Sequence, residues 1–185
     1  MDKAERDLLL VHLAESREML VRAVDGLSGE QQLFRPGEDR WSVADCVEHI
    51  TIVEDSTLKA IQRVLQGPAR PDQQAETSGK DAVILDRVPA RGTRVKGPPQ
   101  VMPSGRWPDF EELLRQFEAT RERTLRFAAV TQADLRSRAF PHPFLGPLDC
   151  YQWLLFSAAH CERHVRQLEE VKADSAFPRG LGASA

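Results

Sequence analysis

The stretch PLDCYQWLLFSAAHCERHVRQLEEVK, residues 147–172, decides the fold, because its apolar residues recur at helical spacing. The residues that define this stripe are Trp153, Phe156, Leu168 and Val171. An amphipathic helix of this length buries its apolar side against other helices. The sequence therefore predicts a long helix that is one member of a helical bundle.

Three further segments share this periodicity: Lys3–Val24, Ser42–Leu65 and Trp107–Val130. The second begins with a serine suited to N-capping, and an aspartate follows three residues later, where the helix dipole favours negative charge. The third carries Pro108 in its first turn, where the missing N–H is harmless. Together with residues 147–172, these segments predict an all-α, four-helix bundle.

The connection between the second and third helices, Gly67–Arg106, is about 40 residues long, which is unusual inside a compact domain. It is long enough to carry the chain back along the bundle, which makes those two helices parallel. Within it, Ala82–Leu85 is apolar enough to dock on the bundle as a short helical turn. The 185 residues fit one domain, expected over 1–173, with a loosely ordered tail at 174–185.

Composition and charge exclude several classes of function. Acidic residues outnumber basic ones by 28 to 25, for a formal net charge of −3, whereas a duplex nucleic-acid binder needs an excess of Lys and Arg. The polar N-terminus lacks a secretory signal, and no apolar run approaches the ~20 residues that span a bilayer. Cys46, Cys150 and Cys161 form no CxxC pair, so no thiolate zinc site is indicated. We expect a cytoplasmic protein with no nucleic-acid or membrane partner.

The chemistry of the sequence is concentrated in a pair of histidines, His160 and His164. Residues four apart on a helix project on the same side, so both imidazoles can chelate one ion. They fall in the stripe that faces the bundle interior, where a metal is a strong partner for a neutral imidazole. His49, at the edge of the second helix's apolar stripe, offers a third ligand from a facing helix. The alternative is a set of buried histidines satisfied by hydrogen bonds alone.

Three motifs carry a family resemblance. They are WSV at 41–43 followed by EHI at 48–50, HPFLGPL at 142–148, and AHCERHVRQL at 159–168. In this order and spacing they resemble the signatures of the DinB-like, or YfiT-like, superfamily of metalloenzymes. Each motif is short, but their order makes the match specific, and the likeness extends over roughly residues 5–172.

The resemblance implies a bundle of up-down-down-up topology, often a homodimer, with a three-histidine metal site, here His49, His160 and His164. The superfamily includes S-transferases that use low-molecular-weight bacterial thiols, and a mycothiol-dependent isomerase. It therefore implies a small-molecule substrate, with a low-molecular-weight thiol as the first candidate. The long Gly67–Arg106 connection departs from typical members, so the resemblance does not identify the substrate.

Three histidine ligands leave at least one coordination position for water or substrate. A divalent ion there can lower the pKa of water or hold a thiol as thiolate, and imidazole ligands suit zinc or nickel. We therefore predict a metal-dependent enzyme that transfers a low-molecular-weight thiol to an electrophile. Two alternatives stay open: a hydrolase that uses a metal-bound water, and a non-catalytic binding or dimerisation module that the metal stabilises.

No second catalytic residue is assigned. Gln167 is expected to make a structural hydrogen bond or to contact a ligand. His142 lies in a proline-flanked loop that is either exposed or near the mouth of the site. Glu48 is expected to face solvent, and Glu54 is too far around its helix to be a ligand. A solvated face is predicted for the charged residues Glu118, Arg121, Glu122 and Arg126.

Overall fold

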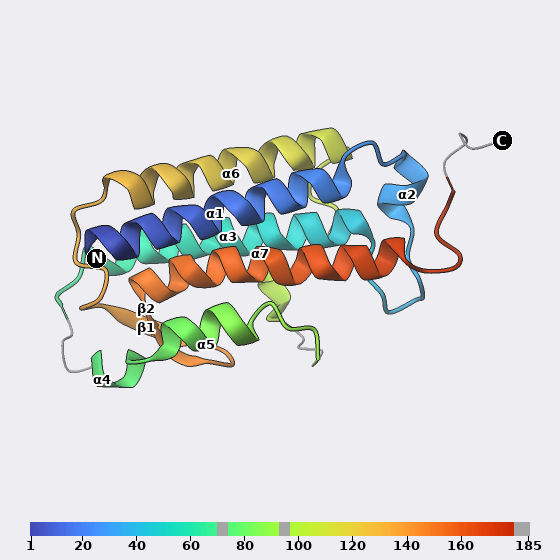
Figure 1. Ribbon diagram of the computed structural model, residues 1–185. Helices are drawn as coiled ribbons and strands as arrows, with labels where there is room; N and C mark the ends of the chain where they lie inside the picture. Colours follow the sequence, from blue (N-terminus) through green and yellow to red (C-terminus); the bar gives the residue numbers. More distant parts are fainter. Residues whose placement is uncertain (70–73, 93–96, 180–185) are drawn as a thin grey trace.

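The structure is a computed structural model that describes residues 1–69, 74–92 and 97–179. Its four long helices are α1 (Lys3–Val24), α3 (Val43–Val64), α6 (Phe110–Val130) and α7 (Cys150–Lys172). Helices α1 and α3 each pack against both α6 and α7, which closes the four into a bundle (Figure 1). Within the described residues, no helix combines the length and apolar character needed to cross a membrane.

The direction of the helices confirms the predicted topology. Helices α1 and α7 run one way along the bundle, and α3 and α6 run the other way (Figure 1). The order along the chain is therefore up-down-down-up, with the second and third long helices parallel. This arrangement needs a connection that crosses the length of the bundle, which explains the long segment between α3 and α6.

Short polar side chains cap the starts of the long helices. The capping residues are Asp2, Ser42, Asp109 and Asp149. The Ser42 hydroxyl accepts from the backbone N–H of Asp45, whose carboxylate accepts from the N–H of Ser42 in return. The cap of α6 corrects one prediction, because Pro108 precedes Asp109 and lies outside the helix rather than in its first turn.

A β-hairpin occupies the segment before α7. Strands β1 (Ala139–His142) and β2 (Gly146–Asp149) pair antiparallel, with His142 opposite Gly146. The predicted start of the last helix near Pro147 is therefore wrong, and α7 begins at Cys150. The chain reverses over residues 143–145, and Gly146 closes the turn with a φ of 69°, a value that residues other than glycine rarely adopt.

The remaining helices of the described chain are short. They are α2 (Gly29–Leu33), α4 (Gln74–Thr77), α5 (Lys80–Arg87) and a 3₁₀ turn, η2 (Pro99–Val101). Helix α5 packs on α7 and buries Ile84 completely, which confirms the docking predicted for Ala82–Leu85. Arg136 fastens α5 to the bundle, because its guanidinium lies 2.6 Å from Asp81 and 2.7 Å from Glu5. Of the predicted tail, 180–185 lies outside the described residues.

Arg121 and Glu54 form a fully buried charged pair in the bundle interior. Arg121 donates to both carboxylate oxygens of Glu54, each at 2.8 Å, and to the Leu13 carbonyl and the Ser16 hydroxyl at 2.6 and 2.7 Å. The predicted solvated face is therefore wrong at Arg121. This residue follows Phe117 by four positions on the buried stripe of α6, and its partner Glu54 comes from another helix.

Candidate metal centre

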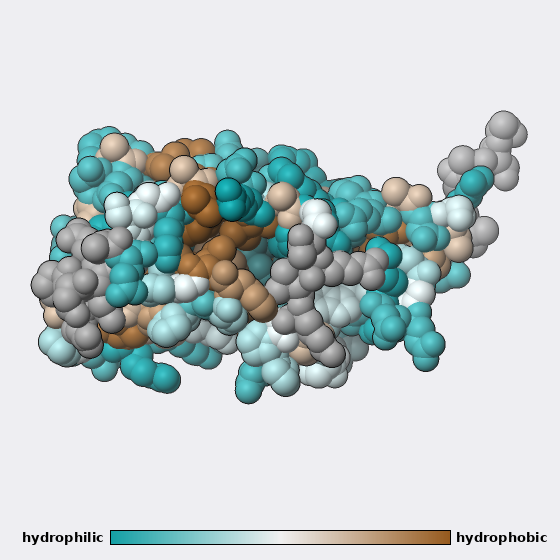
Figure 2. All heavy atoms as spheres, turned by 90° about the horizontal axis from the view of Figure 1, so that it is seen from below, coloured by the Kyte–Doolittle hydropathy of each residue, from teal (hydrophilic) through white to brown (hydrophobic). Residues whose placement is uncertain are grey.

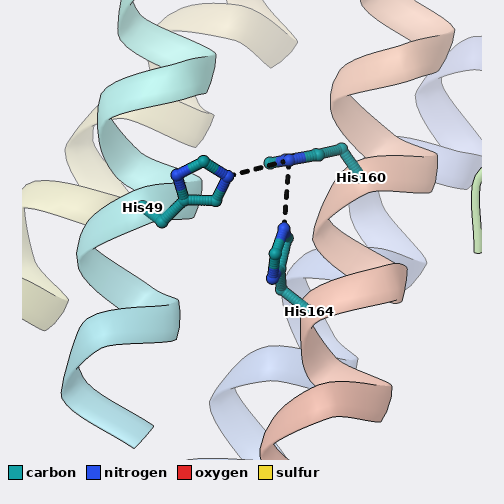
Figure 3. Close-up of side chains that lie close together, drawn as sticks. All are labelled: His49, His160 and His164. Atoms are coloured by element: carbon teal, nitrogen blue, oxygen red, sulfur yellow. Dashed lines mark hydrogen bonds between the residues drawn. The ribbon is translucent and has the colours of Figure 1, made fainter. Parts of the chain in front are cut away.

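Three histidines from two helices point toward one another (Figure 3). His49 projects from α3, and His160 and His164 project from α7; their exposed fractions are 5%, 9% and 6%. The Nε2 atom of His160 lies 3.2 Å from Nε2 of His49 and 3.1 Å from Nε2 of His164. Two nitrogens that share a zinc ion in tetrahedral geometry are roughly 3.3 Å apart. One candidate ligand atom from each histidine lies within 4.8 Å of the other two. The structure thus brings together the three predicted residues at a separation that suits one shared ion.

Hydrogen bonds at the far side of two rings determine where their protons lie. Nδ1 of His49 is 2.7 Å from the Val101 carbonyl oxygen, which can only accept, so this Nδ1 carries the proton. Nδ1 of His164 is 3.0 Å from Oε1 of Gln167. That oxygen also accepts from Arg91 at 3.0 Å, which identifies it as the oxygen of the amide. Both neutral rings therefore present an unprotonated Nε2 to His160.

The three facing nitrogens have too few protons to satisfy one another. His160 can donate one proton from Nε2, and it can give that proton to only one of its two neighbours. At least one buried lone pair is then left facing another nitrogen, which is unfavourable in a low-dielectric interior. A cation at the point where the nitrogens converge removes this deficit. The donor set and its geometry therefore fit a divalent transition metal.

The surroundings keep the rings neutral, which is the form that binds a metal. Burial lowers the pKa of His49, and the hydrogen bond to Val101 offsets this in part. Burial also lowers the pKa of His160 and His164 well below the usual value, and the neighbouring histidines lower it further. All three imidazoles are therefore uncharged at neutral pH.

Glu48 fixes the loop that orients His49. The side chain is only 4% exposed, and its carboxylate accepts from the backbone N–H groups of residues 104, 105 and 106 at 2.8, 2.9 and 3.3 Å. This loop follows η2, which ends at Val101, the residue that accepts from His49. The expectation that Glu48 faces solvent is wrong, because the loop that covers it comes from a distant part of the chain.

A large cleft opens beside the histidines. Its volume is about 1120 Å³, and all three histidines line it. An aromatic end is formed by Phe140, His142, Phe144, Trp153 and Phe156. A cationic end is formed by Arg35, Arg40, Arg91 and Arg163. Figure 2 views this face of the molecule and shows apolar atoms in a hollow bordered by polar ones. A small molecule can therefore reach the histidines from solvent.

The remaining residues singled out in the sequence have clear positions. Gln167 makes the structural hydrogen bond to His164 and also lines the cleft, and His142 lines the aromatic end. Glu54 points away and pairs with Arg121. The missed contributors, Val101 and Arg91, act through long-range contacts that a single sequence does not reveal.

The three cysteines are buried and lie outside the histidine cluster. Burial raises the pKa of Cys46 strongly, and it raises the pKa of Cys150 to about 12 and that of Cys161 to about 11. They behave as small core residues.

Comparisons with known proteins agree with this architecture. A family model described as the DinB superfamily matches residues 12–168. The chain is 24% identical over 160 residues to the uncharacterized protein YuaE of Bacillus subtilis (strain 168), which covers 85% of this chain and 93% of YuaE.

Two solved structures share the fold. TT2238, described as a four-helix bundle protein, superposes with a TM-score of 0.58 at 23% identity, covering 89% of this chain and 98% of its own. YfiT from Bacillus subtilis superposes with a TM-score of 0.60 at 15% identity, covering 96% and 91%. YfiT is described as a probable metal-dependent hydrolase with an unusual four-helix bundle topology. At these identities, the two likenesses establish the fold alone.

Proposed function

This chain belongs to the DinB superfamily, and on that basis we propose that it is a metal-dependent enzyme whose ion is held by His49, His160 and His164. The observation that carries the proposal is the shortage of protons among three buried ring nitrogens that face one another. Zinc or nickel is the expected ion, because both suit imidazole ligands. Three protein ligands are typical of a catalytic site, whereas a structural site has four.

The reaction that we assign to the site is the transfer of a low-molecular-weight thiol to an electrophilic carbon. A divalent ion supplies Lewis acidity, which lowers the pKa of a thiol or a water in contact with it. Among the described residues that line the cleft, the carboxylates are Glu38 and Asp39, and both are exposed on the loop before α3. No buried carboxylate of this lining can therefore act as a general base. A thiolate needs none: its sulfur bonds to carbon, and the leaving group departs with the bonding pair.

The cationic end of the cleft supports a thiol that carries negative charge. Arg91 contacts Gln167, which holds His164, but its guanidinium is paired with the Glu170 carboxylate at 2.9 Å. Arg40 also lines the cleft, and its guanidinium makes no ion pair within the described parts of the chain. A carboxylate on the thiol cosubstrate would find a charge-assisted hydrogen bond at this end.

Hydrolysis is the second candidate, and the description of YfiT as a probable metal-dependent hydrolase favours it. The same three histidines would then serve to activate water. The two candidates differ in what they require, since hydrolysis proceeds without any thiol.

Cobalt substitution separates these functions. We expect mercaptosuccinate, a thiol with two carboxylates, to produce a sulfur-to-metal charge-transfer band on the cobalt-loaded protein, and cysteamine, a cationic thiol, to bind more weakly. His160→Ala should lose the ion and the band. Ester cleavage without thiol, together with an unchanged cobalt spectrum on adding thiols, would establish the hydrolase instead. Protein that retains neither zinc, nickel nor cobalt would end both proposals.

A further inference from the structure

A continuous row of aromatic rings leads away from the metal centre along the cleft. The ring of Phe156 lies 5.1 Å from that of His160, measured between centroids, and 4.5 Å from that of His142. Trp153 follows, 5.5 Å from Phe156, and Phe140 stacks on Trp153 at 4.6 Å with only 6° between the planes. These rings offer flat apolar surface next to the histidines, which suits another planar apolar group.

His142 is the polar member of this row, and the hairpin turn fixes its tautomer. Its Nδ1 accepts from the backbone N–H groups of Phe144 and Leu145, each at 3.2 Å. Lys80 holds the same turn from outside by donating to the carbonyl oxygens of Leu145 and Pro147. Because Nδ1 is an acceptor, the ring proton lies on Nε2. Burial, with the positive charge of Lys80, lowers the pKa of His142 to about 4, so the ring stays neutral.

The Nε2–H group of His142 is a hydrogen-bond donor without an acceptor among the described residues. The residue is 9% exposed, and across residues 1–69, 74–92 and 97–179 no protein atom accepts from this group. Because the ring lines an open cleft, water can pair with this donor, and a ligand that displaces the water keeps the hydrogen bond by supplying an acceptor. The ring lines the cleft, where such a ligand can sit.

We propose that the aromatic end of the cleft binds the electrophilic substrate as a planar apolar group carrying a hydrogen-bond acceptor, and that His142 Nε2–H donates to that acceptor. Aryl esters are the chemical class that fits, because their carbonyl oxygen is the acceptor and their alkoxide is the leaving group; an aryl ketone presents the same acceptor without reacting. The role of this subsite as the electrophile's site rests on the proposed function; the binding itself does not. His142 thereby selects between substrates of the same shape by the presence of an acceptor.

Two nearly isosteric probes test this assignment. 4-Fluoroacetophenone carries a carbonyl where 4-fluoro-α-methylstyrene carries a methylene group, so only the ketone can accept the hydrogen bond. Titrations of the full chain followed by ¹⁹F NMR should show the ketone binding about fivefold more tightly, since a neutral hydrogen bond contributes about 1 kcal/mol. Equal affinities, or no binding of either probe, would overturn the proposal.

Two substitutions separate the function of Nε2 from that of Nδ1. His142→Asn places an amide oxygen where Nδ1 stands and leaves nothing at Nε2, so the turn keeps its acceptor and the ketone preference should vanish. His142→Gln places an amide nitrogen where Nε2 stands, so the preference should persist. Retention of the preference in His142→Asn would contradict the assignment.

A measurement on the unsubstituted chain guards against misfolding of the variants. In ¹⁵N–¹H spectra of the histidine rings, the Nε2 proton of His142 should shift when the ketone is added and not when the styrene is added. Zinc titration of the same samples reports on the metal centre separately. Ketone preference without zinc binding would support the subsite and refute the proposed function. Zinc binding without ketone preference would support the metal site and refute the subsite.

Discussion

The Arg121 cluster and the histidine cluster are both buried and polar, and they are built on opposite principles. Around Arg121, every guanidinium nitrogen has an acceptor: the Glu54 carboxylate, the Leu13 carbonyl or the Ser16 hydroxyl. Burial alone lowers the pKa of Arg121, but the carboxylate outweighs this and raises it above the usual value. In the histidine cluster, by contrast, burial keeps the rings neutral and their nitrogens compete for too few protons.

The difference distinguishes a structural polar cluster from a binding site. A satisfied network has nothing left to offer a ligand, and its loss is a loss of stability. An unsatisfied network next to a cleft retains bonding capacity that only a ligand can use. The contrast predicts that substitutions in the first cluster affect folding and that substitutions in the second affect binding.

The largest effect is expected in the satisfied cluster. Arg121→Ala leaves the Glu54 carboxylate buried without a partner, so the free energy of unfolding should fall by about 3–5 kcal/mol in urea titrations. Arg123, like Arg121, lies on α6, and Arg123→Ala breaks an exposed pair with Asp55 of α3; this matched control should cost at most about 1 kcal/mol. The double variant Arg121→Met with Glu54→Leu should recover most of the loss. Similar losses for Arg121→Ala and Arg123→Ala would remove the distinction between the clusters.

Metal binding should produce the next largest effect. With zinc at about 100 times its Kd, the unfolding free energy of the wild type should rise by about 2.7 kcal/mol. His160→Ala should abolish that rise, and His12→Ala, on α1 and outside the cluster, should keep it. Thermal or urea unfolding with zinc and with chelator measures both. An equal rise in His160→Ala would place the ion elsewhere.

The residues that orient the ligands should change affinity rather than folding. Gln167→Ala removes the acceptor of His164, and Glu48→Ala releases the loop that carries the acceptor of His49. Each should weaken zinc binding about 10–100-fold in competition with a chromophoric chelator, as for other outer-sphere partners. Glu162→Ala, which removes a surface ion pair with Arg166 on α7, is the control and should bind as the wild type does. Unchanged affinity in both variants would mean that ring orientation does not depend on these contacts.

The smallest effect concerns pH in the presence of chelator. The pKa of His160 is lower in the folded chain than in the unfolded chain, where it is about 6.5. Below about pH 6.5 this histidine binds a proton in the unfolded chain but not in the folded chain. The free energy of unfolding is therefore highest above that pH and falls as the pH drops. Each such histidine should contribute a slope of about 1.4 kcal/mol per pH unit. Urea titrations at several pH values should give a shallower slope for His160→Ala; identical slopes would mean that the buried ring is already charged.

Local patterns in the sequence predicted the bundle and the three histidines. The cap at Ser42 and the four-residue spacing of His160 and His164 depend on neighbours along one helix, so a single sequence reveals them. The up-down-down-up order came from the family resemblance, and the length of the crossover agrees with it. The metal-binding role of the histidines stays a proposal.

Features that depend on distant partners were not predictable. Arg121 lies among charged residues and resembles a surface position until Glu54 of α3 is placed beside it. Glu48 likewise looks solvated without the backbone of residues 104–106. The hairpin before α7 was missed because its strands are short and contain prolines, which are weak signals for a strand.

The burial of the three cysteines has a consequence for the thiol chemistry proposed for the cleft. Thiol–disulfide exchange requires a thiolate with access to its partner, and at neutral pH a thiol with a pKa near 11 or 12 is almost wholly protonated. Cys150 and Cys161 therefore do not form mixed disulfides with a small thiol at the histidine site, and Cys46, fully buried, is equally inert. The proposed thiol cosubstrate would therefore leave these cysteines unmodified in both its reduced and its oxidised form.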